Sequence, residues 1–439
     1  MFAIGAFGLG SALGLSACGG LLTVTDPTLV QDKDIATPAG ANSRRLAVVT
    51  WFSAHVNQLA NDVALFTDER MLDLPANRGL TVNYYLDRHD SEGYEALFAN
   101  SSSNDPHLGG WDDIVTRVAT AIPSVRAYSP DSVRGDYLAQ LYAFRGYAIL
   151  QMAEDICPGF PINDIVDDLP VYGAPLSTDS AIALAITQLD SSLKYVQDTL
   201  RFKYFAEVLK GRALLDRGQY AAAAAVVSDV PADFTYTNDG SQTSNFAYGQ
   251  HFRWNQNNEQ FAVGELEGGN GLPFVSAHDP RVLTVFGRRR FTVPADSLYD
   301  QAKYTAFTDP LVLASGLEAQ MIQAEAALND DDPNWLTILN TLRSTQITPA
   351  MSPLVDPGTQ DARVDLMYRE RAFWLYLTGR RLGDMRRLIW NYGRTATSVF
   401  PTGNYPIRGV QYGTGTAIPF IQAVQARVNS KITSGCTTR

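Results

Sequence analysis

The sequence predicts a mostly α-helical protein in which pairs of packed helices form a curved scaffold that carries an irregular, loop-rich subdomain. Three observations predict this fold. Apolar residues recur at helical spacing through most of the 439 residues. One stretch has the pattern helix, tight turn, helix. Two long stretches rich in Asn, Gly and Ser, residues 76–110 and 231–310, interrupt the helical spacing.

The N-terminus is predicted to be a secretion signal followed by a lipid anchor. Residues 1–17 carry no charge and are mainly Phe, Ala, Ile, Gly and Leu, which is typical of a signal-peptide core. The tetrapeptide LSAC that ends at Cys18 resembles the bacterial lipobox, whose cysteine sulfur receives a diacylglyceryl group. We expect a signal peptide over 1–17, lipidation of Cys18 and a lipidated tether over 18–40. The alternative is a buried N-terminal helix with an ordinary core cysteine.

Two cysteines remain, Cys157 and Cys436. An exported protein meets an oxidising compartment. Because two cysteines remain once Cys18 is lipidated, they can form one disulfide between the middle of the chain and its C-terminal tail. We expect that bridge; the alternative is two free thiols. Because the chain contains no CxxC motif, we do not expect a cysteine zinc site.

The first part of the scaffold is expected over residues 41–230 and includes the loop region 76–110. Apolar residues at helical spacing predict four helices before residue 200, with Ser177 or Thr178 capping the last. Their expected ranges are 41–69, 111–125, 133–153 and 178–196.

The clearest supersecondary unit lies at residues 202–227. The stretch FAEVLKGRALLDRGQYAAAAAVV has a helix, a turn at Gly218 and a second helix that is rich in alanine. Small residues in both halves allow the two helices to pack closely. This unit resembles the tetratricopeptide signature, and it predicts a scaffold built from such helix pairs.

An irregular inserted subdomain is expected over residues 231–310, and the helical scaffold resumes over 311–400. Residues 311–328 are predicted to be helical throughout. Asp332 and Pro333 are expected to begin the next helix. A long helical region over 362–390 is expected to break at Gly379 or Gly383, and residues 401–439 form a C-terminal tail.

Four stretches together resemble the SusD/RagB family of outer-membrane nutrient-binding lipoproteins. They are YLAQLYAFRGYAILQMAEDICPGFPI (137–162), HDPR (278–281), LEAQMIQAEAALN (317–329) with the following ILNTLRS, and YRERAFWLYLTGRRLGDMRRL (368–388). Thr378 departs from the family, which usually has Glu at that point. The resemblance implies a non-enzymatic, surface-exposed outer-membrane lipoprotein. Such a protein binds an oligosaccharide or a peptide and delivers it to a partner SusC-like TonB-dependent transporter.

The charged residues of the fourth stretch are expected to be structural. They alternate in sign at spacings of three and four residues, which places opposite charges side by side on a helix. Arginine can brace carboxylates and helix-terminal carbonyls between neighbouring helices. The residues expected to have this role are Glu370, Arg371, Arg380, Asp384 and Arg386.

The expected ligand contacts are aromatic residues in irregular, polar segments. A sugar ring can lay its apolar face on an aromatic side chain, while amides and charged groups meet its hydroxyls. Tyr84, Tyr85, Trp254 and Asn255 meet this description. The alternative for Trp254 is a loop anchor buried against the helices. The resemblance adds Asp68 and Arg70, in the position where family members place charged ligand contacts.

Other functional classes have less support in the sequence. The five histidines are scattered without metal-binding spacing, and neither a GxSxG motif nor a phosphate-binding GxxxxGK[ST] loop is present. The net charge is −11 and the sequence contains no block of basic residues, so we expect no nucleic-acid partner. We expect no cofactor, metal or catalytic residue. A helical peptide-binding scaffold without a sugar site is the alternative function, and a secreted glycoside hydrolase is a distant third.

Overall fold

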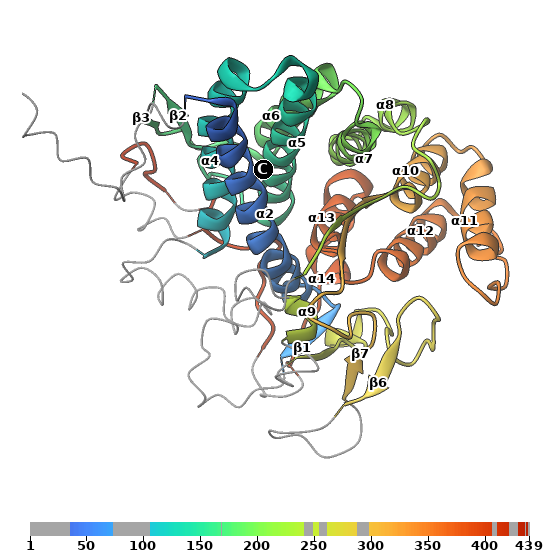
Figure 1. The fold of residues 1–439 in the computed structure, drawn as a ribbon. Coiled ribbons are helices and arrows are strands. Elements are labelled where there is room, and N and C mark those ends of the chain that lie inside the picture. Colours follow the sequence, from blue (N-terminus) through green and yellow to red (C-terminus); the bar gives the residue numbers. More distant parts are fainter. Residues whose placement is uncertain are drawn as a thin grey trace, which may run out of the picture.

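The computed structural model describes residues 36–72, 106–167, 169–240, 249–253, 261–287, 298–405, 411–420, 429–434 and 436–437. Within these residues helices predominate, and Figure 1 shows them arranged in an arc of neighbouring pairs. The predicted fold class, mostly helical with helix pairs as the repeating unit, is confirmed. Among the described helices, none combines the length and hydrophobicity that a membrane span requires.

One half of the arc contains four helices that follow each other along the chain (Figure 1). Thr37 caps the first of them and Ser177 the last, because each side chain accepts a backbone N–H from three residues further on. Ser177, one of the two expected caps, therefore caps this helix. The four helices are α2 (Pro38–Phe66), α4 (Pro106–Tyr128), α5 (Asp131–Asp155) and α6 (Thr178–Tyr195).

The predicted helix–turn–helix unit is confirmed as α7 (Leu200–Asp216) and α8 (Tyr220–Val226). Gly218 occupies the turn with φ of 68°, a left-handed conformation that favours glycine. The next pair, α10 (Gly316–Asn329) and α11 (Asn334–Thr345), packs beside it. The backbone N–H of Asn334 donates to Asp332 Oδ1 at 2.9 Å, so this carboxylate helps to begin α11.

The long helical region near the C-terminus is divided, as the glycines predicted. Helix α12 (Gln360–Trp374) ends before a turn at residues 375–380, and α13 (Arg381–Tyr392) follows. Gly379 has φ of 75° in that turn, whereas Gly383 lies inside α13. The short helix α14 (Ala396–Val399) completes this part of the chain.

The described strands form four two-stranded antiparallel pairs. One pair corrects the expectation of a helix throughout residues 311–328: residues 311–315 are a strand, because the run LVLAS pairs with residues 235–238 before Ser315 caps α10. The pairs are β1 (Arg70–Leu72) with β5 (Phe261–Val263), β2 (Asp164–Val166) with β3 (Leu169–Val171), β4 (Thr235–Asn238) with β8 (Leu311–Ser315), and β6 (Thr284–Phe286) with β7 (Tyr299–Gln301). The remaining short elements are α9 (Gln250–Phe252) and a 3-10 helix (Glu267–Gly269).

The main hydrophobic core lies between α2, α4, α5, α6 and α7 and extends to β8 and the turn after α12. A second cluster joins α10, α11 and α12, with Trp335 and Tyr368 among its buried members. The helix pairs therefore bury their apolar faces against neighbouring pairs rather than around a single sheet.

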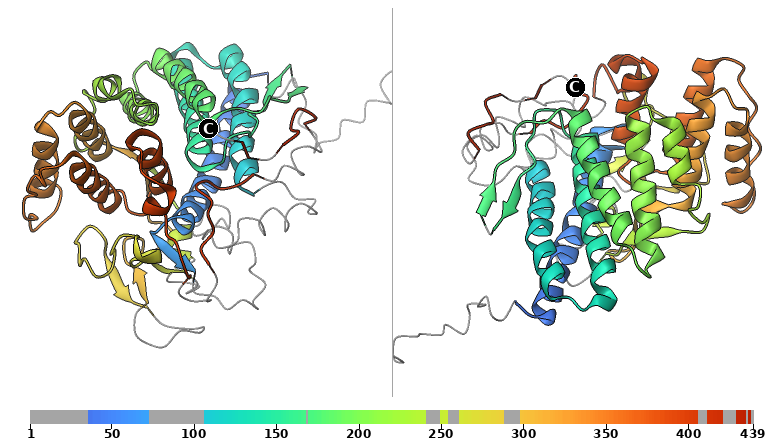
Figure 2. Two further views of the ribbon diagram at one scale, coloured as in Figure 1. Left: turned by 180° about the vertical axis from the view of Figure 1, so that it is seen from behind. Right: turned by 90° about the horizontal axis from the view of Figure 1, so that it is seen from above.

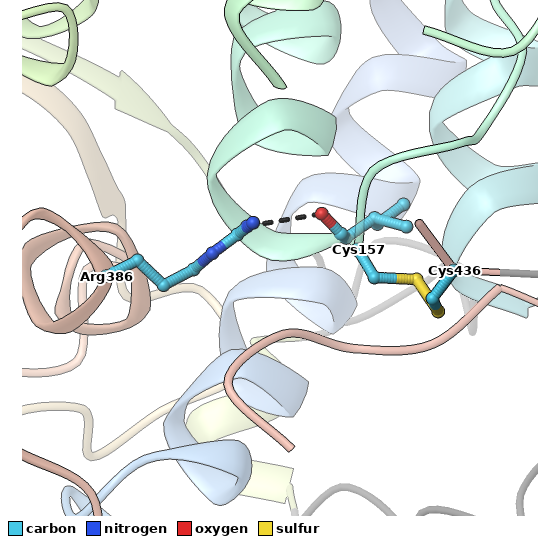
Figure 3. The surroundings of a disulfide bond; sticks show 4 residues. Cys157, Arg386 and Cys436 are labelled. Atoms are coloured by element: carbon cyan, nitrogen blue, oxygen red, sulfur yellow. Dashed lines mark hydrogen bonds between the residues drawn. A yellow bond between two sulfur atoms is a disulfide. The ribbon is translucent and has the colours of Figure 1, made fainter. Parts of the chain in front are cut away.

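The C-terminal tail returns to the end of α5. Ile418 pairs with Ile156 in a parallel bridge, and the N–H of Cys157 donates to the carbonyl of Ile418 at 3.0 Å. Cys157 and Cys436 form a disulfide across a sequence separation of 279 residues (Figure 3). The structure therefore contains the expected bridge between the middle of the chain and the tail.

Candidate functional site

The charged residues of α12 and α13 form a buried ion network. Arg371 donates two hydrogen bonds to the Asp384 carboxylate, at 3.0 and 2.8 Å. Arg387 lies between three carboxylates, those of Glu325 at 2.8 Å, Asp216 at 2.7 Å and Asp384 at 2.7 Å. Although burial alone raises the pKa of Asp384, the neighbouring Arg371 and Arg387 lower it below its usual range.

A second buried ion cluster involves the HDPR stretch. The Arg281 guanidinium contacts the carboxylates of Asp279 and Glu370, both at 2.6 Å. Arg343 of α11 reaches the same Glu370 at 2.8 Å. Glu370 thus joins α12, α11 and the segment before β6 through two arginines.

Two further arginines of the motif bind polar groups of other elements. Arg380 donates to the carbonyl of Leu313 at 2.9 Å and to the Tyr147 hydroxyl at 3.2 Å. Arg386 donates to the carbonyls of Ala153 at 3.0 Å and Ile156 at 3.2 Å, at the C-terminal end of α5 (Figure 3). Carbonyl groups at that end lack helical partners, so the cation satisfies them. Arg371, Arg380, Arg386 and Arg387 therefore connect elements inside the protein.

Asp68 and Arg70 have internal partners instead of a place on the surface. Asp68 has no exposed surface and accepts two hydrogen bonds from Arg381, at 2.7 and 2.8 Å. Arg70 is 2% exposed and donates to Asn61 Oδ1 at 2.9 Å. We therefore correct the expectation that these two side chains contact a ligand: both are buried and are held by partners inside the protein.

Glu69 lies between these two residues in the sequence. It connects the end of α2 to the turn before α13. Its carboxylate accepts the N–H of Leu377 at 2.8 Å, and burial raises its pKa to about 7. Lys303 lies close by and donates to the carbonyl of Tyr376. Burial lowers the pKa of Lys303 to about 8, since its charge is removed from water.

Four of the expected ligand residues, Tyr84, Tyr85, Trp254 and Asn255, lie outside the described residues, as does Cys18. The described chain nevertheless fixes where their segments begin and end. Leu72 is the last described residue before the first segment, and Phe261 is the first after the second. Leu72 pairs with Phe261 in the β1–β5 ribbon. One end of each segment therefore joins the described structure at this point, while the other ends adjoin Pro106 and Arg253.

The described residues beside that point form a small rigid corner. Met71 and Ala262 of the ribbon pack against Tyr405 and Tyr412, whose rings meet edge to face. The Tyr412 hydroxyl donates to the buried Glu267 carboxyl, and burial raises the pKa of Glu267 to about 7. We call these residues and the β1–β5 ribbon the ribbon corner. It is our candidate functional site, because it carries both segments with expected ligand contacts.

Within the described part of the chain, no group of three His, Cys, Asp or Glu side chains is placed to hold a metal ion. The carboxylates of the ion network are held by arginines in the interior. The sequence did not identify Glu325 as the partner of Arg387, although Glu325 lies in the stretch LEAQMIQAEAALN. Only the packing of α10 against α13 brings the two together.

Comparisons with known proteins show where this fold occurs. No protein-family model matches the sequence, and no curated protein matches it. Among solved structures, a SusD superfamily protein from Bacteroides thetaiotaomicron has a TM-score of 0.66 at 11% identity, covering 91% of this chain and 100% of that chain. NanU from B. fragilis has a TM-score of 0.61 at 13% identity, covering 94% and 99%.

A SusD-like carbohydrate-binding protein from Bacteroides vulgatus is also similar, with a TM-score of 0.57 at 14% identity, covering 80% of this chain and 83% of that chain. The likeness therefore extends over most of the scaffold and the elements between its helices. At these identities it establishes a shared fold.

Proposed function

We propose, from the SusD-superfamily fold that this chain shares with its structural neighbours, that it is a non-enzymatic protein that binds a saccharide. The observation that carries the proposal is the likeness over 80% of the chain to a structure described as a SusD-like carbohydrate-binding protein. The same fold in NanU and other SusD superfamily structures supports it.

The binding site that we propose is built on the ribbon corner. Tyr84, Tyr85 and Trp254 would provide apolar faces for sugar rings, and Asn255 would meet hydroxyl groups. The support is that one end of each segment joins the protein at the paired residues Leu72 and Phe261.

We propose that the protein acts at the cell surface as a lipoprotein. The lipobox-like LSAC sequence supports lipidation at Cys18 and attachment to the outer membrane. By resemblance to the SusD/RagB family, the partner is a SusC-like TonB-dependent transporter, which receives the bound saccharide.

A glycan array followed by calorimetric titration tests saccharide binding. We expect the wild-type protein to bind at least one oligosaccharide and Trp254→Ala to weaken that binding at least tenfold. The control is Tyr128→Ala, which removes an aromatic side chain that is 41% exposed on α4. Equal affinity of the wild type and Trp254→Ala would remove Trp254 from the site. Absence of any glycan ligand, with a peptide bound instead, would favour the alternative scaffold function.

The anchor is tested separately by fractionation and mass spectrometry of the native protein. Wild-type protein is expected in the outer-membrane fraction with an acylated Cys18, and Cys18→Ser in the soluble fraction. An unprocessed N-terminus with an unmodified thiol at position 18 would contradict the lipoprotein proposal and, with it, the transport role. Turnover of a glycan by the purified protein would indicate the hydrolase function.

A further inference from the structure

We propose that a pocket beside the Cys157–Cys436 disulfide is a second saccharide-binding site, separate from the ribbon corner. This inference rests on the proposed saccharide-binding function. The pocket has a volume of about 460 Å³ and is lined by the disulfide, the end of α13 and residues 414–419 of the tail. That volume lies within the range of small-molecule sites. We call it the disulfide pocket.

An aromatic ring contributes to the apolar lining of the disulfide pocket. Trp390, which is half-buried in the last turn of α13, lines it together with Pro158 and Pro419. The Cζ atom of Arg386 lies 4.4 Å from the centre of the Trp390 ring, so the ring is braced from the preceding helical turn. A braced indole offers the flat apolar surface on which the C–H face of a sugar can lie.

The polar groups of the pocket match a neutral polyhydroxyl ligand. Thr414, Thr416 and Thr437 contribute hydroxyl groups, each of which can donate and accept a hydrogen bond. Among the described residues that line the pocket, Arg386 alone carries a charge, and its guanidinium already donates to carbonyls at the end of α5. These groups therefore favour uncharged sugar hydroxyls over an acidic ligand.

Two other hollows on the described surface are less suited to a sugar. One, of about 360 Å³ between the start of α2 and α4, has no tryptophan in its lining. The other, of about 320 Å³ beside α12 to α14, also lacks a tryptophan, and its Asp365 and Arg394 are paired at 2.8 Å. The aromatic residues in the described linings of these two hollows are Tyr128 and Tyr368, and each lining contains at least two charged residues, whereas the described lining of the disulfide pocket has a tryptophan and a single charged residue.

The wall of the disulfide pocket is fixed before any ligand arrives. The disulfide ties Cys436 to the end of α5, and the N–H of Thr437 donates to the carbonyl of Pro158 at 2.8 Å. On the other side, the N–H of Ile418 donates to the carbonyl of Asp155 at 2.8 Å. A ligand therefore does not have to order the tail, which lowers the entropic cost of binding.

Two substitutions test the site by different means. Trp390→Ala removes the aromatic surface, and Gly415→Leu adds a side chain to a lining position. A Cβ at Gly415 would lie 3.6 Å from both its nearest neighbours, which is ordinary van der Waals contact. Ser344→Leu, on the exposed end of α11, is the matched control for the added leucine. Circular dichroism confirms that each variant is folded.

The probes are neutral hexasaccharides of glucose, xylose, mannose and galactose, titrated by calorimetry with tryptophan fluorescence as a second readout. We expect Trp390→Ala and Gly415→Leu each to weaken one binding event at least tenfold, and Trp254→Ala and Ser344→Leu to leave that event unchanged. Wild-type affinity and stoichiometry in both folded pocket variants would overturn the second site alone. If the wild type binds none of the probes while the glycan array finds a ligand elsewhere, the second site also fails. A wild type without any glycan ligand removes the proposed function as well.

Discussion

At the scale of single residues, this protein uses arginine in its interior as a connector. Arg371, Arg380, Arg386 and Arg387 are nearly inaccessible to solvent, and each reaches carboxylates or carbonyls on other elements. The planar guanidinium group can make several directed hydrogen bonds at once, which lysine cannot reproduce. The network therefore determines how α5, α10, α12 and α13 meet.

We predict that Arg387→Leu destabilises the protein strongly. The substitution leaves Glu325, Asp216 and Asp384 buried without the cation that they share, and breaking a buried pair typically costs about 3–5 kcal/mol. Urea unfolding measures the loss. The control is Arg363→Leu, which removes the exposed partner of Asp356 and should change stability much less. Equal losses in the two variants would contradict a specific role for the buried network.

A second residue-scale prediction concerns Asp62 of α2. Burial raises the pKa of its carboxyl to about 7 in the folded protein, whereas an unfolded Asp ionises near its ordinary pKa of about 3.9. The folded state therefore holds the proton more tightly. The stability contributed by Asp62 is complete below about pH 4, is lost as the pH rises to about 7, and then stays constant.

Asp62→Asn removes this titration. Between about pH 5 and about pH 7.5, we expect the stability of the variant to rise relative to the wild type by about 2 kcal/mol. Urea unfolding of both proteins at each pH gives the difference, in which the titration of other groups cancels. A difference that does not change with pH would show that Asp62 is ionised throughout this range.

At the scale of elements, the turn between α12 and α13 directs the motif arginines to their partners. Gly379 has φ of 75°, and a Cβ there would lie 3.2 Å from the Cβ of Ala60 in α2. Glycine permits both the left-handed backbone and the close approach of the two elements. The turn is therefore coupled to the position of α2.

We predict that Gly379→Ala costs more stability than Gly393→Ala. Both glycines have a left-handed backbone, with φ of 75° and 66°, and an L-residue there costs about 1–2 kcal/mol. A Cβ added to Gly393, at the end of α13, would meet no atom within 4 Å, so its variant reports backbone strain alone. The additional loss in Gly379→Ala, measured by thermal or urea unfolding, reports the contact with Ala60. Equal losses of stability in the two variants would mean that α2 accommodates the added Cβ without a cost in free energy.

At the scale of the whole molecule, the tail returns to the end of α5. Figure 2 shows the C-terminus beside the helices of the N-terminal half of the chain in both views. Ile418 and Cys436 each bind the end of α5, through a β-bridge and a disulfide. Closing so long a loop restricts the unfolded chain far more than the folded one.

Cys436→Ser is therefore expected to destabilise the oxidised protein by about 2–5 kcal/mol. Thermal unfolding in the absence of a reductant should show a lower Tm for the variant than for the wild type. Addition of a reductant should lower the Tm of the wild type and leave that of the variant unchanged. An identical Tm for both proteins without reductant would contradict a stabilising bridge in solution.

Local patterns in the sequence determined the helical elements of this protein. Apolar spacing predicted α6 because this helix buries one face, and it predicted α5, whose residues from Gly146 to Asp155 are all buried. Gly218 and Gly379 predicted two turns because their backbone conformations exclude most other residues. The strand at residues 311–315 escaped prediction, since its partner lies more than seventy residues earlier in the chain, at residues 235–238.

Only the tertiary structure decided which partners the charged residues have. Asp68 and Arg70 were expected from the sequence to contact a ligand, yet packing buries them beside Arg381 and Asn61. The disulfide pocket likewise exists because the tail returns to α5 and brings Thr416 near Trp390. The sequence alone determined which segments become helices and turns, because those choices depend on neighbouring residues. Burial and charge pairing depend on residues that are distant in the chain, so they were decided only when the helices packed together.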